Sequence, residues 1–319
     1  MQAQLMFEGT SRRVHFTPVA ACNSGDVVQL PGGLAGVCTT DIAAGIQGAA
    51  RIDGVYKLTK TASIALLIGG DMWWDVSAGK GNFKGDLAST DYKFGTVHAD
   101  AIGADTYCYG RLNGTTNYDI DLSNDSSGWV AEELAAGVAG AVNAHPGGGA
   151  QIVISADSEV QANVLRSVRT VLVSSKPIFE TIFTRSATTD AANDLDIGLA
   201  TGGHASDFET VADFAAFHLD GDDLNIDTHS DDGGTDRAPA DSTIDHVEGT
   251  FGEYWIDARD DTNVKFYVDG ILVDTSSTKR ILTAALARGV AAVAMIEKTT
   301  GTSVGGMRIT RMRVRKQAE

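Results

Sequence analysis

Short apolar segments separated by glycine, aspartate and threonine dominate residues 19–76. The strands expected from this pattern cover residues 27–28, 34–37, 40–45, 54–60 and 69–75. Turn-forming residues recur about every 8 to 12 positions, a spacing typical of closely packed β-strands. Two later segments, 93–97 and 106–112, continue the pattern. We therefore expect a compact β domain in the first third of the chain.

The rest of the chain also has the patterns of β-strands. Residues 214–219 and 224–228 alternate between apolar and polar on either side of a Gly-Asp-Asp turn, which predicts a hairpin, and 254–258 with 264–268 predict a second one. Further strands are expected at residues 151–155, 168–173, 178–184, 272–274, 290–296 and 307–314. In the last of these the alternation changes phase between Ile309 and Met312, which predicts a β-bulge.

These elements indicate an all-β protein with a β-sandwich in its second part. Segment 129–144 fits either a helix or a pair of strands, and we favour the pair. The polar run 123–128 reads as a linker, so we expect domains at residues 1–122 and 123–319. A length of 319 residues suits two domains of ordinary size.

Composition narrows the cellular context. Residues 1–14 lack the apolar stretch of a signal peptide, and no segment approaches the length of a membrane-spanning helix. We therefore expect a soluble protein made in the cytoplasm, with no membrane partner. The cysteines Cys22, Cys38 and Cys108 are odd in number and far apart in sequence, which favours buried free thiols over disulfides or a zinc site.

The net charge of −17 is strongly acidic. In segment 186–261 the only lysine or arginine residues are Arg237 and Arg259, among many aspartates. Such a surface repels phosphate backbones, so we expect no nucleic-acid partner and interpret the acidic region as a solvated face. The basic run at 308–316 is expected to pair with acidic residues of the protein itself.

Few residues have the spacing of a catalytic or metal-binding motif. Glu253 and Asp257 alternate onto one strand face, as the paired carboxylates of a glycoside hydrolase do, but a third carboxylate at the hydrolytic spacing is missing. The sequence has no metal-binding histidine motif, no phosphate-binding loop and no nucleophile motif. We therefore expect that the protein is not an enzyme and holds no catalytic metal. An irregular calcium site is the one cofactor considered, against ordinary exposed turns; its candidate ligands are Asp220, Asp222, Asp223, Asp231 and Asp232.

The first domain resembles the capsid cement (decoration) proteins of tailed bacteriophages. The resemblance is carried by residues 25–28, 36–37, 41–45, 54–58, 74–75, 95–97 and 111–113. It implies a small β-barrel or sandwich that binds the outside of the mature head, as a homotrimer where major capsid subunits meet. Segment 2–14 is interpreted as an arm that orders on the capsid, with the candidate contacts Leu5, Met6, Phe7, Arg12 and Arg13.

The second domain resembles the concanavalin A-like (laminin-G-like) jelly rolls. The hairpin at 254–275, YWIDARDDTNVKFYVDGILVDT, carries this resemblance, and segments 179–183 and 292–298 fit the same framework. It implies a jelly-roll β-sandwich, which would project outward like a head fibre. The fold hosts lectins, hydrolases and interaction modules, so it does not determine a function.

Taken together, these patterns favour a structural virion protein on the capsid exterior that stabilises the lattice of the major capsid protein. The alternative is a module that binds glycans on the host surface and is anchored to the capsid by its first domain. A concanavalin-like glycoside hydrolase is the third hypothesis, and the missing carboxylate speaks against it.

Overall fold

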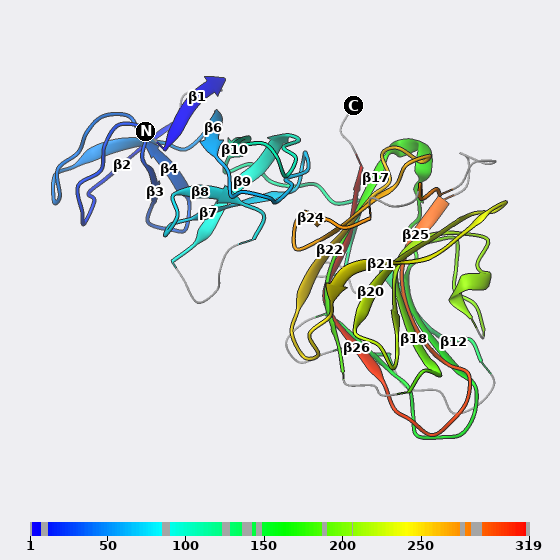
Figure 1. Cartoon of the computed structure of the whole chain (residues 1–319). Helices are drawn as coiled ribbons and strands as arrows, with labels where there is room; N and C mark the ends of the chain where they lie inside the picture. Colours follow the sequence, from blue (N-terminus) through cyan, green and yellow to red (C-terminus); the bar gives the residue numbers. More distant parts are fainter. Residues whose placement is uncertain are drawn as a thin grey trace. The chain divides into compact units, whose positions relative to one another are not determined.

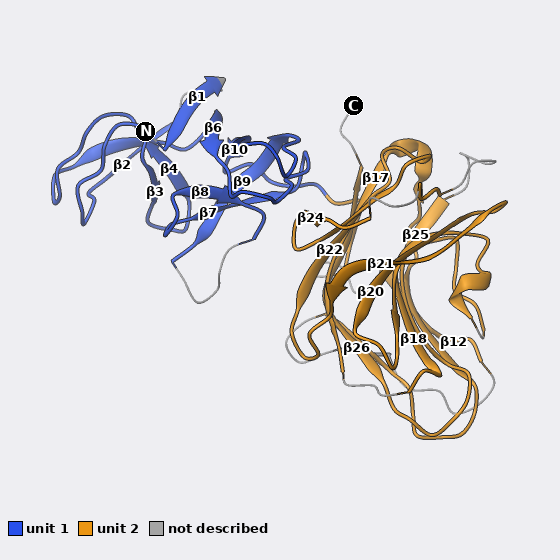
Figure 2. Ribbon diagram, viewed as in Figure 1, with its two compact units in different colours: residues 1–117 blue, residues 118–319 orange. Residues whose placement is uncertain are grey.

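The computed structural model describes residues 2–7, 12–84, 90–122, 128–135, 142–144, 149–186, 190–205, 207–274, 278–281 and 289–316. Regular structure in these residues is β, apart from short 3-10 turns such as Val173–Ser175 (η2) and Phe208–Thr210 (η3) (Figure 1). The predicted all-β fold class is confirmed. The chain forms two compact units, residues 1–117 and 118–319 (Figure 2). The boundary lies a few residues before the expected one, because residues 120–121 pair with the last strand of the second unit.

Unit 1, residues 1–117, is built from two antiparallel sheets. Its strands are β1 (Ala3–Phe7), β2 (Arg13–Phe16), β3 (Val27–Gln29), β4 (Ala35–Cys38), β5 (Gly48–Arg51), β6 (Val55–Thr59), β7 (Asp71–Asp75), β8 (Lys80–Asn82), β9 (Tyr92–Ala99) and β10 (Tyr107–Leu112). One sheet has the order β1-β6-β10-β9-β7-β8, and the other has the order β2-β5-β4-β3.

The six-stranded sheet curls back on itself. A parallel bridge joins Lys60, just after β6, to Gly81 in β8, and the Thr61 N–H donates to the Gly81 carbonyl at 3.0 Å. The enclosed side chains are almost fully buried; they include Tyr56, Leu58, Met72, Trp74 and Phe94. Of the small β-barrel or sandwich that the family resemblance implies, this closure around an aromatic core fits the barrel.

Two expectations for unit 1 were wrong. Residues 40–45 form a turn instead of a strand, with Ile42 alone bridging to Cys22 and Gly45 at a φ of +74°. The N-terminal segment is not a free arm in its described parts. Ala3 is buried, β1 pairs with β6, and β2 pairs with β5, because the apolar residues of this segment find partners in the domain's own sheets.

Unit 2, residues 118–319, is a sandwich of two larger antiparallel sheets. Its strands are β11 (Ile120–Asp121), β12 (Trp129–Glu133), β13 (Val142–Ala144), β14 (Ala150–Val153), β15 (Gln161–Ser167), β16 (Val171–Leu172), β17 (Pro177–Arg185), β18 (Asn193–Ala200), β19 (Asp213–Asp220), β20 (Asn225–Asp232), β21 (Asp236–Asp245), β22 (Gly252–Asp257), β23 (Lys265–Val268), β24 (Ile271–Leu272), β25 (Gly289–Lys298) and β26 (Gly306–Lys316).

The two sheets of unit 2 are named sheet E and sheet F. Sheet E has the order β13-β14-β26-β17-β22-β23-β24, with β11 beside β26. Sheet F has the order β12-β15-β25-β18-β19-β20-β21, with β16 beside β25. The two sheets stack face to face (Figure 1). Alternate residues of both sheets meet in one apolar core. Phe217 of sheet F packs edge-on against Phe266 and Tyr254 of sheet E, with ring centroids 5.2 Å apart in both pairs. The predicted β-sandwich is therefore confirmed.

The local predictions for unit 2 mostly hold. Strands β19 and β20 pair as one hairpin, and β22 and β23 pair as the other. The bulge is confirmed at Thr310: Phe183 is opposite Ile309 while Ile182 is opposite Arg311. Segment 129–144 contains strands β12 and β13, which lie in different sheets and do not form a hairpin. Of the linker run, residues 123–127 lie outside the described residues.

Candidate functional site

A groove of about 330 Å³ lies in unit 1 between β1 and the four-stranded sheet. Val37 of β4 and Tyr56 of β6 line it and are almost fully buried, so they provide an apolar base. Leu5 of β1, half-buried, lines the groove from the edge of the six-stranded sheet. The groove is therefore a junction between the two sheets of unit 1.

Two arginines give this groove its charge. Arg13 in β2 and Arg51 in β5 are direct cross-strand partners, and both line the groove. None of the described residues that line it is acidic. Guanidinium groups bind carboxylates through two parallel hydrogen bonds. The groove is thus suited to a carboxylate group on an apolar partner.

The structure brings together only part of the predicted capsid-contact set. Leu5 and Arg13 both line the groove, whereas Met6 and Arg12 do not. The Arg12 backbone N–H instead donates to the Asp53 carboxylate, at 3.1 and 3.0 Å to its two oxygens.

Phe7 belongs to the predicted contact set, and Arg51 lines the groove without belonging to that set. Phe7 ends β1, and its side chain lies outside the described residues. Arg51 was missed in the sequence, because a single arginine after the small residues of segment 48–50 carries no local signal of its partner Arg13. That these residues contact a capsid stays a prediction.

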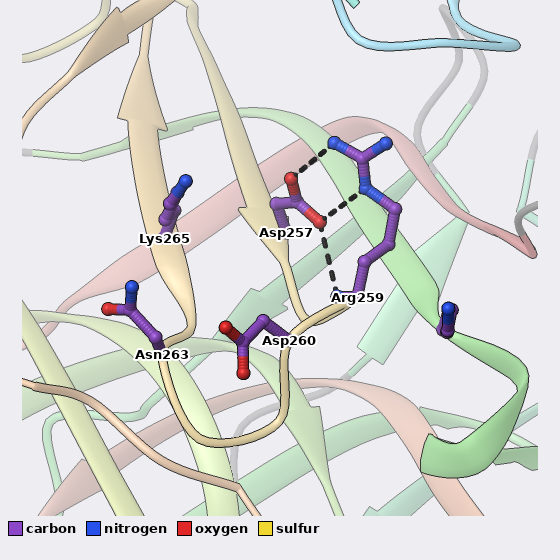
Figure 3. A pocket seen from close by; sticks show the side chains of 6 residues that line it. Asp257, Arg259, Asp260, Asn263 and Lys265 are labelled. Carbon is purple, nitrogen blue, oxygen red and sulfur yellow. Dashed lines mark hydrogen bonds and ion pairs between the residues drawn. The ribbon is translucent and has the colours of Figure 1, made fainter.

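Unit 2 has a polar pocket of about 210 Å³ beside the turn between β22 and β23 (Figure 3). Its lining residues are Lys176, Asp257, Arg259, Asp260, Asn263 and Lys265. Arg259 donates through Nε and Nη2 to the two Asp257 oxygens, at 2.8 and 2.6 Å. This bidentate pair holds the pocket wall, and the lysine, amide and carboxylate groups around it offer both donors and acceptors to a polar ligand.

The two carboxylates considered for hydrolysis do not share a cavity. Asp257 lines the polar pocket and is paired with Arg259. Glu253 is buried, accepts a hydrogen bond from the Trp255 indole at 3.0 Å, and pairs with Arg311. Burial raises the pKa of Glu253, opposed by the charge of Arg311. The arrangement resembles a structural ion pair more than a nucleophile and an acid around an open site.

The five candidate calcium ligands are divided between the two ends of one strand. Asp220 ends β19 and Asp222 and Asp223 follow it in the turn to β20, whereas Asp231 and Asp232 end β20. β20 has eight residues, so at about 3.4 Å per residue its ends are roughly 24 Å apart, and the five do not form one site. Calcium binding at either end stays a prediction.

The carboxylates at these two ends are occupied by local backbone groups. Asp231 Oδ1 accepts the Gly233 N–H at 2.7 Å, and Asp232 Oδ1 accepts the Thr235 N–H at 2.8 Å. At the other end Asp223 accepts the Asn225 N–H at 3.0 Å. Such bonds close turns. In the described part of the chain, no group of three or more His, Cys, Asp or Glu side chains is placed to hold a metal ion.

The C-terminal basic run is paired internally, as expected. Three of its arginines lie on the face of sheet E that points away from the core, and each contacts an acidic residue of unit 2: Arg311 with Glu253, Arg313 with Asp121 and Arg315 with Glu180. Lys316 extends the row to Asp119, at 2.9 Å. This ladder ties β11, β17 and β22 to β26, so the run is structural and not a phosphate-binding patch.

A row of ionisable groups crosses the face of sheet F that points away from the core. His218 Nδ1 in β19 is 3.0 Å from Asp196 Oδ1 in β18, and Asp227 in β20 is the cross-strand partner of His218. Burial alone lowers the pKa of His218, but the surrounding carboxylates, Asp196 above all, raise it to about 10. Burial raises the pKa of Asp194 to about 7. Residues 193–200 alternate between polar and apolar, which is the pattern of the strand β18 that they form.

Comparison with known proteins bears on both units. Residues 8–112 match a family model described as phage cement protein. No curated protein matches the sequence. Within the part of the chain that the structure describes, no helix is long and apolar enough to cross a membrane.

Several solved structures are similar to the chain. A protein of unknown function from Shewanella oneidensis MR-1 is 13% identical, with a TM-score of 0.43, over 61% of this chain and 82% of that one. The potassium-bound carbohydrate recognition domain of Emp46p is 13% identical, with a TM-score of 0.43, over 63% of this chain and 94% of that one. The carbohydrate-binding module CBM66 from Bacillus subtilis is 11% identical, with a TM-score of 0.37, over 58% of this chain and 94% of that one.

The family match falls within unit 1 and covers most of it. It agrees with the resemblance drawn from the glycine and strand pattern of residues 25–113, and it supports a structural role in a phage particle.

Proposed function

We propose that this protein binds the exterior of the mature phage head through unit 1, reinforces the lattice of the major capsid protein, and exposes unit 2 to solvent. The observation that carries the proposal is the match of residues 8–112 to the phage cement protein family. The closed barrel of unit 1 supports it, because a rigid base is needed to bridge neighbouring capsid subunits.

The groove of unit 1 is the contact that we propose for the capsid. It combines an apolar base with Arg13 and Arg51 and has no acidic lining residue among those described. Its partner is then an extended segment of the major capsid protein that carries an aspartate or glutamate. Leu5 would pack against the aliphatic part of that segment, and the arginines would bind its carboxylate.

Unit 2 has the properties of a solvent-exposed outer module. The whole chain is strongly acidic, and three arginines of β26 are used in internal ion pairs. Acidic surfaces keep a protein present in many copies soluble. Hydrolysis is not proposed, because Glu253 and Asp257 are each bound to an arginine and do not share a cavity.

The purified protein should be incubated with mature, undecorated phage heads and then sedimented and imaged by cryo-electron microscopy. Saturable binding at regular lattice positions is expected, with threefold clusters if the protein acts as a homotrimer. Heads that stay undecorated at micromolar protein would reject the proposal. Heads from the same phage that already carry their decoration protein are the control, and they should bind no further copies.

A second function is favoured by the polar pocket of unit 2. Its mixture of ammonium, amide and carboxylate groups matches the hydroxyl groups of a sugar. In this alternative, unit 2 binds a host-surface glycan while unit 1 anchors it. Binding of the full chain on a glycan array, lost in the variant Arg259→Ala, would support the alternative. An array without any signal above background would remove it.

A further inference from the structure

Two cysteines that are separated in sequence meet in unit 1. The Sγ atoms of Cys22 and Cys38 are 3.0 Å apart, and both residues are buried as free thiols. A disulfide has an S–S bond of about 2.05 Å, so an approach of roughly 1 Å would join them. The third cysteine, Cys108, belongs to β10 of the barrel, not to this small core.

The backbone around the two thiols is held in place by hydrogen bonds. The Cys38 N–H donates to the Asp26 carbonyl at 2.9 Å, and the Cys38 carbonyl accepts the Gly25 N–H at 2.8 Å. Cys22 exchanges two backbone hydrogen bonds with Ile42, at 3.0 and 2.8 Å. Each segment is held by its own backbone hydrogen bonds, Cys38 within β4 and Cys22 in an isolated bridge to Ile42, and this arrangement places the two sulfur atoms side by side.

The hydrophobic core around the two thiols is small. Its buried members, besides the two cysteines, are Phe16, Leu30, Ile42 and Ala50. A core of this size supplies little hydrophobic stabilisation, and small β units of this kind gain much from a covalent link. The sheet also carries Arg13, Val37 and Arg51 of the groove, so whatever stabilises it also fixes the shape of the groove.

We propose that Cys22 and Cys38 are an oxidisable pair that forms an intramolecular disulfide when the protein leaves a reducing compartment. The oxidant is a small-molecule disulfide. The thiolate of one cysteine attacks it and releases one small thiol, and the thiolate of the other then attacks the mixed disulfide and releases the second. Two protein thiols are oxidised, one small disulfide is reduced to two thiols, and the two protons end on those thiols or in water.

Two consequences follow for the measurement. The link closes a loop between residues 16 positions apart in sequence, which restricts the unfolded chain and should raise the melting temperature of unit 1 by roughly 10 °C. The reaction should be slow at neutral pH and faster at alkaline pH, since burial raises the pKa of the Cys38 thiol and only the thiolate reacts.

The experiment uses the chain of residues 1–319, reduced and then exposed to hydroxyethyl disulfide at pH 8.5. After denaturation and alkylation, trypsin releases residues 14–51 as one peptide with both cysteines and 94–111 as one with Cys108. Peptide 14–51 is expected to lose two hydrogen atoms and take up no alkylating reagent. Cys108 is buried in the barrel, away from the other two cysteines, so it should remain a free thiol and be alkylated after denaturation; it serves as the internal control.

Peptide 14–51 that remains doubly alkylated after days in the oxidant would overturn the proposal, as would a stable mixed disulfide with the oxidant. The variants Cys22→Ser and Cys38→Ser should each abolish the rise in melting temperature on oxidation, whereas Cys108→Ser should leave it. A rise that persists in Cys22→Ser would also overturn the pairing. The outcome does not depend on capsid binding, so the proposed function is tested separately.

Discussion

Arg315 and Glu180 form a nearly buried ion pair between β26 and β17, with Arg315 Nε 2.7 Å from Glu180 Oε1. The Tyr118 hydroxyl lies 3.1 Å from the second carboxylate oxygen, Oε2. Both partners lie on the outer face of sheet E, where the pair ties the last strand to the centre of the sheet. Charges buried this far from water are tolerated only while they are paired.

We therefore expect Glu180→Gln to destabilise unit 2 by about 3 kcal/mol, because it removes the carboxylate charge that pairs with the nearly buried Arg315 guanidinium. Urea unfolding of the full chain measures the change. The matched control is Glu132→Gln, which removes the partly exposed pair with Arg166 and should lower the free energy of unfolding by less than about 1 kcal/mol. Equal losses in the two variants would contradict this reading of the arginine ladder.

The ionisable row of sheet F makes the stability of unit 2 depend on pH. Folding raises the pKa of His218 to about 10, of Asp194 to about 7 and of Glu297 to about 9, the last by burial and by nearby aspartates. All three groups bind protons more tightly in the folded state than in the unfolded state. Stability contributed by the His218 charge is complete below about pH 6.5 and is lost as the pH rises toward 10.

The free energy of unfolding of unit 2 should therefore fall steadily from pH 6 to pH 9. Deprotonation of Glu297 in this range adds a buried negative charge beside Asp194 and Asp196. Glu297→Gln cannot be deprotonated and keeps an acceptor for the Phe208 N–H, so its decline should be shallower. Thermal unfolding across the pH series measures both slopes, and identical slopes in variant and wild type would contradict the assignment.

Close packing of β18 on β19 requires a glycine at position 198. A Cβ built there would overlap the Ala215 carbonyl oxygen and come within 2.7 Å of the Ala216 Cα, both of which are backbone atoms. We expect Gly198→Ala to destabilise unit 2 by more than about 2 kcal/mol, since backbone atoms cannot move aside. Gly202→Ala is the control, because nothing lies within 4 Å of its added methyl group. Similar melting temperatures for the two variants would contradict this.

The charge of the groove in unit 1 leads to a prediction about capsid affinity. Arg13→Glu reverses one of the two cross-strand guanidinium charges, so binding to undecorated heads should weaken at least about tenfold. Arg12→Glu makes the same change one residue away, outside the groove lining, and should bind nearly as wild type. Sedimentation titration at two salt concentrations measures both. Equal weakening would show that overall charge matters and the groove does not.

Local sequence patterns were sufficient for the hairpins and for the bulge. Strand alternation on both sides of a short turn needs only neighbouring residues, and β19 with β20 and β22 with β23 pair as that pattern predicts. The slip between Ile309 and Met312 likewise marked the extra residue Thr310. β21 gave no signal, because DRAPADSTID is a polar edge strand that contains a proline.

Contacts between distant segments could not be read from the chain. The spacing of Cys22 and Cys38 gave no reason to pair them, and Arg13 and Arg51 became partners only through the register of β2 on β5. The segment interpreted as an arm became two paired strands, since sheets elsewhere in unit 1 offered edges for β1 and β2. The predicted calcium ligands were split because the eight residues of β20 separate them.

By itself the sequence determined that the protein is all-β, where most of its strands and both hairpins lie, and that its N-terminal part follows the phage cement pattern. These properties depend on the period of side chains along a strand and on turn chemistry, which are local. Only the tertiary structure decided which charges are paired, which cysteines meet and where a groove opens. Those depend on the order and register of strands that are far apart in the chain, and one-residue shifts in register would change every one of them.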